Sequence, residues 1–273
     1  MRKRQTSIAI VNDMSGFGRC SVTVALPILS AMKIQCGVVP TAILSNQTEY
    51  PSYTMLDFTD HMEKYISNWK KLNFSFDGLY TGFLGSEKQI DIINHMIHSF
   101  QFEHIIIDPV MGDHGRLYDS YTKEMCQHMK NLIKNATVIT PNVTELCLLT
   151  DHPYSKNLTT DNIKGMCQEL SKYNIDNIIV TGIENDGLVG NATYNNGKFY
   201  IKYQKKIHPM RPGTGDVFAS VIAGCILKGI PLLDATDIAT EYVRDCLISS
   251  VEYDIPINDG VCFEEHLNKL ISL

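Results

Sequence analysis

The sequence alternates short apolar runs with longer stretches of helical spacing, and this order constrains the fold more than any other feature. The apolar runs are rich in β-branched residues and nearly free of charge, which is typical of strands buried on both faces. Strands are predicted at residues 7–11, 36–39, 78–80, 104–108, 136–140 and 177–181, and helices at 21–32, 60–69, 86–100, 121–133, 161–173, 216–228 and 233–250. This order predicts an α/β fold of three αβα layers around a mostly parallel central sheet.

Two local signals refine this prediction. Asn195-Asn196-Gly197 separates residues 188–194 from 198–202 and predicts a hairpin that adds antiparallel edge strands. Ser86-Glu87-Lys88-Gln89 predicts a capping box at the start of a helix. The chain has no Pro-, Gly- or Ser-rich linker and no internal repeat, so residues 1–273 are expected to form a single domain.

Composition excludes several classes of function. Acidic residues number 30 against 24 basic ones, giving a net charge of -6, so a nucleic-acid partner, which needs a basic face, is not expected. No segment approaches the roughly 20 apolar residues of a membrane span. The eight cysteines form no CxxC pair. They are therefore expected to be free thiols in a reducing, cytoplasmic setting.

A glycine-rich loop follows the first predicted strand. Its Gly16 and Gly18 fall one residue short of the dinucleotide fingerprint, and the next strand ends without the acidic residue that would bind a ribose. An NAD-dependent oxidoreductase is therefore disfavoured. The glycines fit a tight turn or a close approach of ligand to backbone. The polar Asn12 and Asp13 at the strand end favour a pocket.

Two further strand ends carry polar groups. Asp108 and Asp113 lie at and just after the end of the buried strand 104–108. Mg²⁺ is usually bound by one or two carboxylates together with phosphate oxygens and water, so these two residues are candidate ligands. The alternative is a turn capped by Asp, which is common. Thr140, Asn142 and Glu145 follow the next strand, and Thr144, in the same segment, is expected to cap a short helix. Because ligands bind beyond the carboxyl ends of parallel strands, these groups are expected to share one edge.

The sharpest motif is the segment Arg211-Pro212-Gly213-Thr214-Gly215-Asp216, directly before an apolar helix. Its glycines let backbone N–H groups converge at a helix N-terminus, which predicts an anion hole. Asp216 could simply favour the helix N-terminus, or it could serve as a general base that deprotonates a hydroxyl. Walker-A and protein-kinase motifs are absent from the sequence.

These motifs together resemble a known family. Gly213-Thr214-Gly215-Asp216 is similar to the anion-hole and base motif of the ribokinase-like superfamily of small-molecule kinases. The segments 108–113 and 140–145 resemble the pyridoxal/pyridoxine (vitamin B6) kinase branch. Ser45-Asn46-Gln47-Thr48 resembles its substrate loop, with Gln47 where His is usual, and segment 81–86 resembles its Ser/Thr-Gly-Tyr region, with Phe83 in place of Tyr.

The resemblance implies one αβα kinase domain without a separate lid, usually a homodimer, that transfers the ATP γ-phosphate to the 5′-hydroxymethyl group of pyridoxal, pyridoxine or pyridoxamine. Asp216 would be the general base. The amides of Gly213, Thr214 and Gly215 would stabilise the transferring phosphoryl group. The vitamer would lie against Asn12, Gln47, Thr48, Phe83 and Asp216.

The resemblance also implies sites for ATP and for cations. Mg²⁺ would be held by Asp113 and Glu145, directly or through water. A K⁺-like monovalent cation would lie near Asp108, Thr140 and Thr181. ATP would contact Asp113, Asn142, Glu145, Thr181, Gly182, Thr214 and Gly215, with segment 205–208 at its border and either Lys205 or Lys206 near it.

Two alternatives remain open at this stage. Hydroxymethylpyrimidine kinases of thiamin synthesis carry a similar glycine-rich turn and phosphorylate a hydroxymethyl group on a related aromatic ring. A non-catalytic protein that binds a nucleotide or a vitamin would need the amides of the motif but not its acid, so the intact Gly-Thr-Gly-Asp argues against it.

Overall fold

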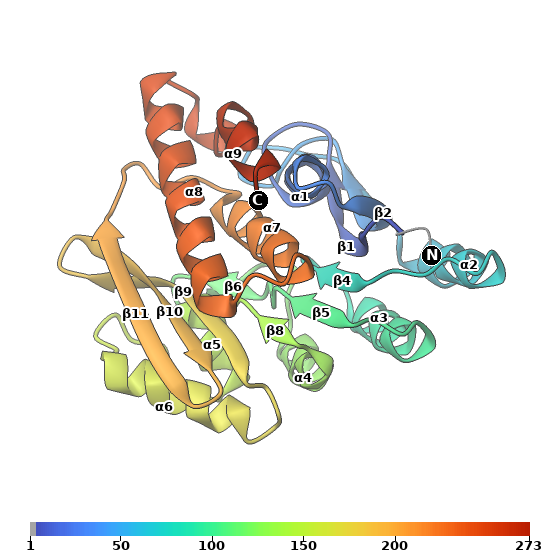
Figure 1. Cartoon of the computed structure of the whole chain (residues 1–273), viewed down its shortest axis with the longest axis horizontal. Helices are drawn as coiled ribbons and strands as arrows, with labels where there is room; N and C mark the ends of the chain where they lie inside the picture. The colour runs from blue at the N-terminus through green and yellow to red at the C-terminus, as the bar shows by residue number, and fades with distance from the viewer. Residues whose placement is uncertain (1–3) are drawn as a thin grey trace.

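Nine strands form one sheet in the computed structural model, which describes residues 4–273 (Figure 1). Their order is β11-β10-β9-β8-β5-β4-β1-β2-β3, and the strands from β9 across to β2 run parallel. The antiparallel strands β10 and β11 form one edge of the sheet, and β3 forms the other. The strands are β1 (Ser7–Ser15), β2 (Gln35–Leu44), β3 (Met55–Asp57), β4 (Gly78–Thr81), β5 (His104–Ile107), β8 (Val138–Ile139), β9 (Asn177–Asn185), β10 (Leu188–Asn195) and β11 (Lys198–Lys205).

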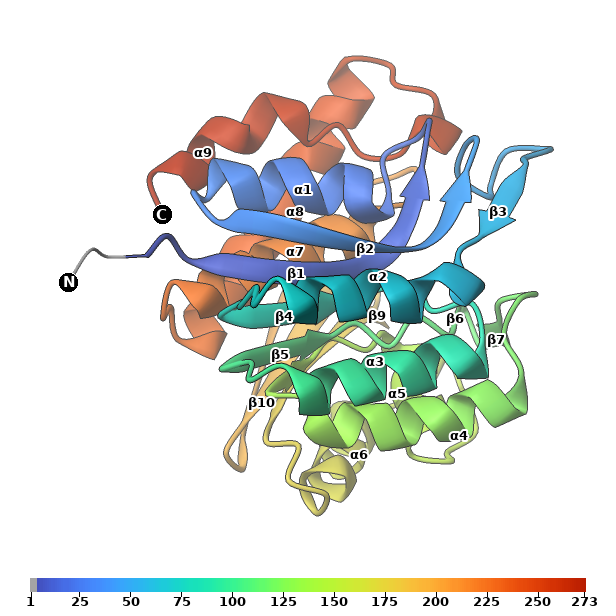
Figure 2. The same ribbon diagram turned by 90° about the vertical axis from the view of Figure 1, so that its right-hand side faces the viewer.

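Helices cover both faces of this sheet (Figures 1 and 2), which confirms the predicted three-layer α/β fold. One layer holds α2 (Thr59–Lys71), α3 (Glu87–Ser99), α4 (Lys123–Leu132), α5 (Val143–Leu149) and α6 (Thr160–Ser171). The other holds α1 (Ser21–Ala31), α7 (Thr214–Leu227), α8 (Leu232–Glu252) and α9 (Leu267–Ile271). Among residues 4–273, no helix has the length and apolar character needed to cross a membrane.

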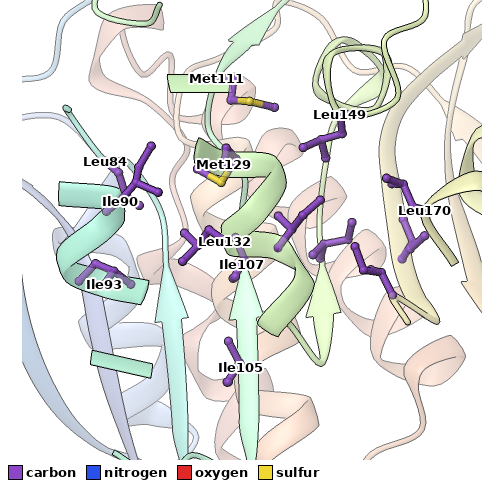
Figure 3. Packing of buried hydrophobic residues seen from close by; sticks show 14 of the residues in the cluster. Leu84, Ile90, Ile93, Ile105, Ile107, Met111, Met129, Leu132, Leu149 and Leu170 are labelled. Atoms are coloured by element: carbon purple, nitrogen blue, oxygen red, sulfur yellow. The ribbon is translucent and has the colours of Figure 1, made fainter. Parts of the chain in front are cut away.

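Strand β5 shows how the apolar runs build two cores. Ile105 and Ile107 point into the core beneath α3 and α4, whereas Ile106 joins the core beneath α1 and α7. Figure 3 shows Ile107 beside Leu132 of α4, with Ile105 further down the same strand. Because successive side chains of a strand alternate between faces, only a continuous apolar run can satisfy both cores.

The hairpin prediction is also confirmed. Strand β10 ends at Asn195 and β11 begins at Lys198, so Asn196 and Gly197 form the two-residue turn. Both turn residues have positive φ, 48° and 82°. This is the backbone of a type I′ turn, which Asn-Gly adopts at little cost.

Several elements differ from the prediction. Strand β2 continues through Pro40 to Leu44 and pairs with the unpredicted β3. Pro40 is accommodated because it lies opposite Asn12, where the register between β1 and β2 shifts. A small hairpin of β6 (Gly112–Asp113) and β7 (Arg116–Leu117) was also not predicted.

The capping box at α3 is only half formed. Ser86 Oγ accepts the Gln89 amide at 3.2 Å, but the Gln89 side chain does not return to Ser86. Its carboxamide instead accepts the Gly85 amide and donates to the Thr41 carbonyl and the Thr59 hydroxyl. The buried Gln89 therefore joins α3 to β2 and α2.

All eight cysteines, as predicted, are free thiols.

The packing of α1 on α7 yields a stability prediction. Gly224 of α7 faces the fully buried Met32, and a Cβ at this position would collide with the Met32 sulfur. Overpacking costs about 1–3 kcal/mol and the helix preference of alanine returns about 1 kcal/mol, so Gly224→Ala should lower the free energy of unfolding by up to about 2 kcal/mol. Gly165→Ala is the matched control, because Gly165 is an exposed helical residue with open space around it.

The control should raise the free energy of unfolding by about 1 kcal/mol, since alanine favours helix more than glycine does. Urea denaturation of the two variants measures both effects. Equal shifts of the same sign would contradict the packing assigned to Gly224.

Candidate active site

Polar side chains gather at the carboxyl edge of the parallel strands. Asn12 lies in β1, Asp108 follows β5 and Thr140 follows β8. Strands β1, β4, β5 and β8 are neighbours and run parallel, so their carboxyl ends lie at one edge of the sheet. In Figure 2 this is the edge at the arrowheads of β1 and β2. Helix α7 begins near the same edge, where Asn12 contacts Asp216.

The start of α7 depends on a glycine. Gly213 is the N-cap of the helix and has a φ of 81°. A Cβ at Gly213 would also collide with the Arg19 carbonyl of the glycine-rich loop. The position thus requires glycine on both grounds. Its backbone brings the amides of Thr214 and Gly215 to the free N-terminus of the helix, where an anion is favoured.

Asp216 lies in the first turn of α7, partly buried. Burial raises the pKa of its carboxyl to about 6, and the nearby Asp13 adds to the increase. The Ser21 amide and the Asn12 side chain donate hydrogen bonds that oppose it, the latter from Nδ2 to Oδ1 at 3.4 Å. Asp216 is therefore a carboxylate near neutral pH, with a basicity well above that of an ordinary aspartate.

Asn12 is fully buried and connects three segments. Its Oδ1 accepts the Phe83 amide at 2.8 Å and the Asp13 amide at 3.0 Å, while its Nδ2 reaches Asp216. Gly82 makes room for this side chain, because a Cβ there would collide with the Asn12 amide. Asn12 thus fixes Asp216 relative to the half-buried Phe83.

Asp13 is a site residue that the motif comparison missed. It is buried, and it accepts the Ser21 hydroxyl at 2.5 Å and the Ser15 hydroxyl at 3.2 Å. Burial raises the pKa of its carboxyl. Ser21 has a φ of 53°, and its amide also donates to Asp216, so Asp13 holds a residue that touches the candidate base. The signal in the sequence was an acid at the end of an apolar strand.

Asp108 and Thr140 meet, as predicted from their strand ends. The Thr140 hydroxyl donates to Asp108 Oδ1 at 3.0 Å. Burial and the negative charge of Asp216 raise the pKa of Asp108 to about 8. A cation near Asp108 and Thr140 would stabilise the carboxylates of Asp108 and the nearby Asp216, so the donor set fits a cation site.

The carboxylate of Glu145 is buried, and both of its oxygens already accept hydrogen bonds from the protein. Its two oxygens accept the Asn142 amide at 2.8 Å and the Met111 amide at 3.1 Å, and burial raises the pKa of its carboxyl well above the usual range. Asn142, and not Thr144 as predicted, is the N-cap of α5 and forms a capping box with Glu145. Thr144 instead accepts the Gly115 amide at 2.9 Å.

Asp113 lies in the β6–β7 hairpin, which α5 holds in place. Asn142 Nδ2 donates to the Gly112 carbonyl at 2.8 Å, next to Asp113. The Asp113 side chain is 45% exposed. Residues 4–273 contain no group of three or more His, Cys, Asp and Glu side chains placed to hold a metal. Mg²⁺ bound with phosphates needs only one or two carboxylates and water, so the exposed Asp113 fits as a ligand, whereas Glu145, whose two oxygens already accept amides, fits only a role through water.

The candidate nucleotide residues lie along the neighbouring strand. The Thr181 amide donates to the Pro141 carbonyl at 3.0 Å, which places Thr181 and Gly182 beside Asn142. Gly182 has a φ of 73° and is exposed. Lys206 pairs with Glu184 at 2.6 Å, whereas Lys205 is exposed at the end of β11. Of the two lysines, Lys206 is the one held by a contact in this structure.

Gln47, which was expected to lie against the vitamer, uses its side-chain amide within the protein. Its Nε2 donates to the Asn258 carbonyl at 2.8 Å, and its Oε1 accepts the Glu49 amide at 2.8 Å. Only 5% of Gln47 is exposed. The amide therefore braces its own loop, whereas the adjacent Thr48 is exposed.

Comparison with known proteins places the chain in a family. Residues 28–260 match the family described as phosphomethylpyrimidine kinase. A pyridoxine/pyridoxal/pyridoxamine kinase from Bordetella avium is 25% identical over 254 residues, which span 88% of this chain and 84% of the relative.

Solved structures agree with this assignment. A Bacteroides thetaiotaomicron protein, provisionally named a phosphomethylpyrimidine kinase and also crystallised with pyridoxal, is 39% identical. It superimposes with a TM-score of 0.96 over 99% of this chain and 95% of its own. The pyridoxal kinase of Lactobacillus plantarum is 25% identical, with a TM-score of 0.93 over 99% of this chain and 98% of its own. The chain therefore belongs to the phosphomethylpyrimidine kinase family of the ribokinase-like superfamily, with B6 kinases among its relatives.

Proposed function

We propose that this protein phosphorylates the 5′-hydroxymethyl group of pyridoxal, pyridoxine or pyridoxamine with ATP. One observation carries the proposal: Asp216, whose pKa is raised to about 6, lies in the first turn of α7 directly after the Gly213–Gly215 amides. A basic carboxylate beside an anion site is what the transfer of a phosphoryl group to a hydroxyl requires. The names of the Bordetella and Lactobacillus relatives support B6 vitamers as acceptors.

The chemistry follows from these positions. The acceptor hydroxyl oxygen attacks the γ-phosphorus, and the bond from this phosphorus to the bridging β–γ oxygen breaks. Asp216 takes the hydroxyl proton, and ADP carries away the electron pair of the broken bond. The amides of Gly213, Thr214 and Gly215, at the positive end of α7, stabilise the charge on the phosphoryl oxygens during transfer.

Cations would complete the phosphate side. Mg²⁺, when bound, would neutralise the charge on the β- and γ-phosphates, held by Asp113 and, through water, by Glu145. A monovalent cation would lie at Asp108, Thr140 and Thr181, where it would offset the two buried carboxylates Asp108 and Asp216. The nucleotide would extend from the α7 N-terminus past Asn142 toward Thr181 and Gly182.

The acceptor ring would lie between Asn12, Thr48 and Phe83, with its hydroxymethyl group at Asp216. Phe83 offers a half-buried aromatic side chain, and the Asn12 contacts fix the Phe83 backbone relative to Asp216. In this proposal Gln47 acts by shaping the loop that carries Thr48. A homodimer, implied by the family resemblance, stays a prediction.

Hydroxymethylpyrimidine kinase is the second candidate function. A Bacillus subtilis relative named a hydroxymethylpyrimidine/phosphomethylpyrimidine kinase, 26% identical over 187 residues, favours it. The acceptor would again be a hydroxymethyl group on an aromatic heterocycle, so Asp216 and the α7 amides would perform the same step. The two candidates differ only in the ring that the pocket accepts.

A panel of acceptors tests the substrate. Steady-state turnover with pyridoxal, pyridoxine, pyridoxamine and hydroxymethylpyrimidine should show at least one B6 vitamer with the highest kcat/KM. Turnover confined to hydroxymethylpyrimidine would establish the second candidate instead. Binding of ATP and vitamers without turnover would show a binding protein.

The role of Asp216 is tested with a matched pair of variants. Asp216→Asn removes the proton acceptor and should lower kcat at least about 100-fold, with acceptor affinity largely kept. Asp234→Asn is the control, because Asp234 is also the third residue of its helix, α8, but is exposed. Its turnover should equal that of the wild type. Unchanged turnover in Asp216→Asn would refute the assignment.

The pH dependence follows from the raised pKa of Asp216. The base works as a carboxylate, so kcat/KM for the acceptor should fall about tenfold per pH unit below about pH 6. Asp13→Asn removes a negative charge that raises the pKa of Asp216, so this limb should move to lower pH. ATP and the acceptor have the same pKa values whichever protein is assayed, so they cannot cause a difference between the two profiles. If the acidic limb of the profile does not move in Asp13→Asn, a substrate group and not Asp216 causes it.

A further inference from the structure

A short C-terminal turn contacts two loops of the candidate site and the side chain of Arg211. We define the C-terminal turn as residues 256–260, which contain the 3₁₀ helix Ile257–Asp259. The acceptor loop comprises residues 45–50 and the glycine-rich loop residues 16–20. In Figure 2 the segment after α8 comes down beside the tip of β1, where these loops lie.

The acceptor loop is bound to this turn by three hydrogen bonds. Gln47 Nε2 donates to the Asn258 carbonyl at 2.8 Å, and Asn258 Nδ2 donates to the Glu49 carbonyl at 3.1 Å. The Tyr50 hydroxyl donates to the Asp259 carboxylate in a short contact. A hydrogen bond to a charged acceptor is stronger than a neutral one, so the Tyr50–Asp259 bond is the strongest of the three.

The same turn is anchored to the phosphate side of the site. The Arg19 amide of the glycine-rich loop donates to the Asp259 carbonyl at 3.1 Å. The buried guanidinium of Arg211, two residues before Gly213, donates to the Pro256 carbonyl at 3.0 Å and to the Ser250 carbonyl at 3.2 Å. The turn therefore has a fixed side, through Arg19 and Arg211, and carries the acceptor loop on its other side.

The turn contributes little to the apolar cores. Ile257 is 49% exposed, and a hollow of about 410 Å³ lies beside the turn, lined by Pro209, Arg211, Val251, Asp254, Ile255, Pro256 and Ile257. The acceptor loop also contacts the glycine-rich loop, through the Gln47 amide to the Phe17 carbonyl at 2.9 Å and the Tyr50 ring 6.0 Å from the Phe17 ring, so it should shift, and not detach, when one of the three hydrogen bonds to the turn is lost. Cutting one should displace the acceptor loop while the cores stay intact.

We propose that the C-terminal turn is a positioning element for acceptor binding, and that Tyr50 and Asp259 are its positioning residues. They set the place of the acceptor loop, and through it of Thr48, without touching the substrate. This inference rests on the proposed function, because it assigns the loop to the acceptor and not to ATP.

Kinetics of three variants test the proposal. Tyr50→Phe and Asp259→Ala each remove the bond between the two side chains, and each should raise KM for the preferred acceptor about 3- to 10-fold. The kcat and KM for ATP should stay within about twofold of wild type. Tyr53→Phe is the control, since Tyr53 is an exposed tyrosine near the same loop, and its parameters should not change.

The double variant sharpens this test. Tyr50→Phe/Asp259→Ala should be no worse than either single variant, because both substitutions remove the same bond. An unchanged acceptor KM in the single variants, or an equal rise in KM for ATP, would overturn the proposal. A merely structural role would lower the melting temperature without separating the two KM values.

Hydrogen exchange tests the same bond without any turnover. Amides of residues 45–54 should exchange several-fold faster in Tyr50→Phe and Asp259→Ala than in wild type or Tyr53→Phe. If the wild type phosphorylates no vitamer, the proposed function fails, and exchange alone then decides whether the turn holds the loop. Unchanged exchange in both variants would overturn that part of the proposal.

Discussion

The structure depends on keeping several carboxylates out of water at one edge of the sheet. Asp13, Asp108, Glu145 and Asp216 each have a pKa raised by burial. A buried charge is costly unless hydrogen bonds or opposite charges offset it. Here hydroxyls and backbone amides supply those bonds: Ser21 and Ser15 to Asp13, Thr140 to Asp108, and two amides to Glu145. The loops at this edge take their shapes from these contacts.

This arrangement explains how an acidic protein can bind phosphates. The negative charge of Asp216 raises the pKa of Asp108, and that of Asp13 raises the pKa of Asp216, so a nearby cation would stabilise these carboxylates. Cations bound at this edge would relieve that repulsion and at the same time neutralise ATP. The anion itself would meet backbone amides at the start of α7. No cluster of lysines or arginines is needed, so a net charge of -6 is compatible with the proposed reaction.

Sequence patterns predict the strands, turns and helix starts of this molecule better than they predict the hydrogen bonds between distant side chains. The Ile105–Ile107 run and the Asn196-Gly197 turn are governed by local rules, and both formed as expected. The Gly213–Asp216 segment likewise begins a helix, because only glycine tolerates the backbone at its N-cap. In contrast, the Gln47 amide pairs with Asn258, a residue 211 positions away, which no local pattern indicates. Asn142 and Thr144 are both residue types that cap helices and lie two positions apart, so local pattern alone does not separate them, and the structure gives the cap to Asn142.

The two edges of the sheet differ in how readily they could pair with another molecule. Strand β11 presents its open edge with Lys198, Lys202 and Lys205 exposed along it, and charged side chains of this kind oppose pairing with another chain. Strand β3 at the opposite edge is short but carries the exposed Met55 and Leu56. Attraction between molecules in concentrated solution should therefore occur mainly at the β3 edge, whereas the lysines of the β11 edge repel other molecules.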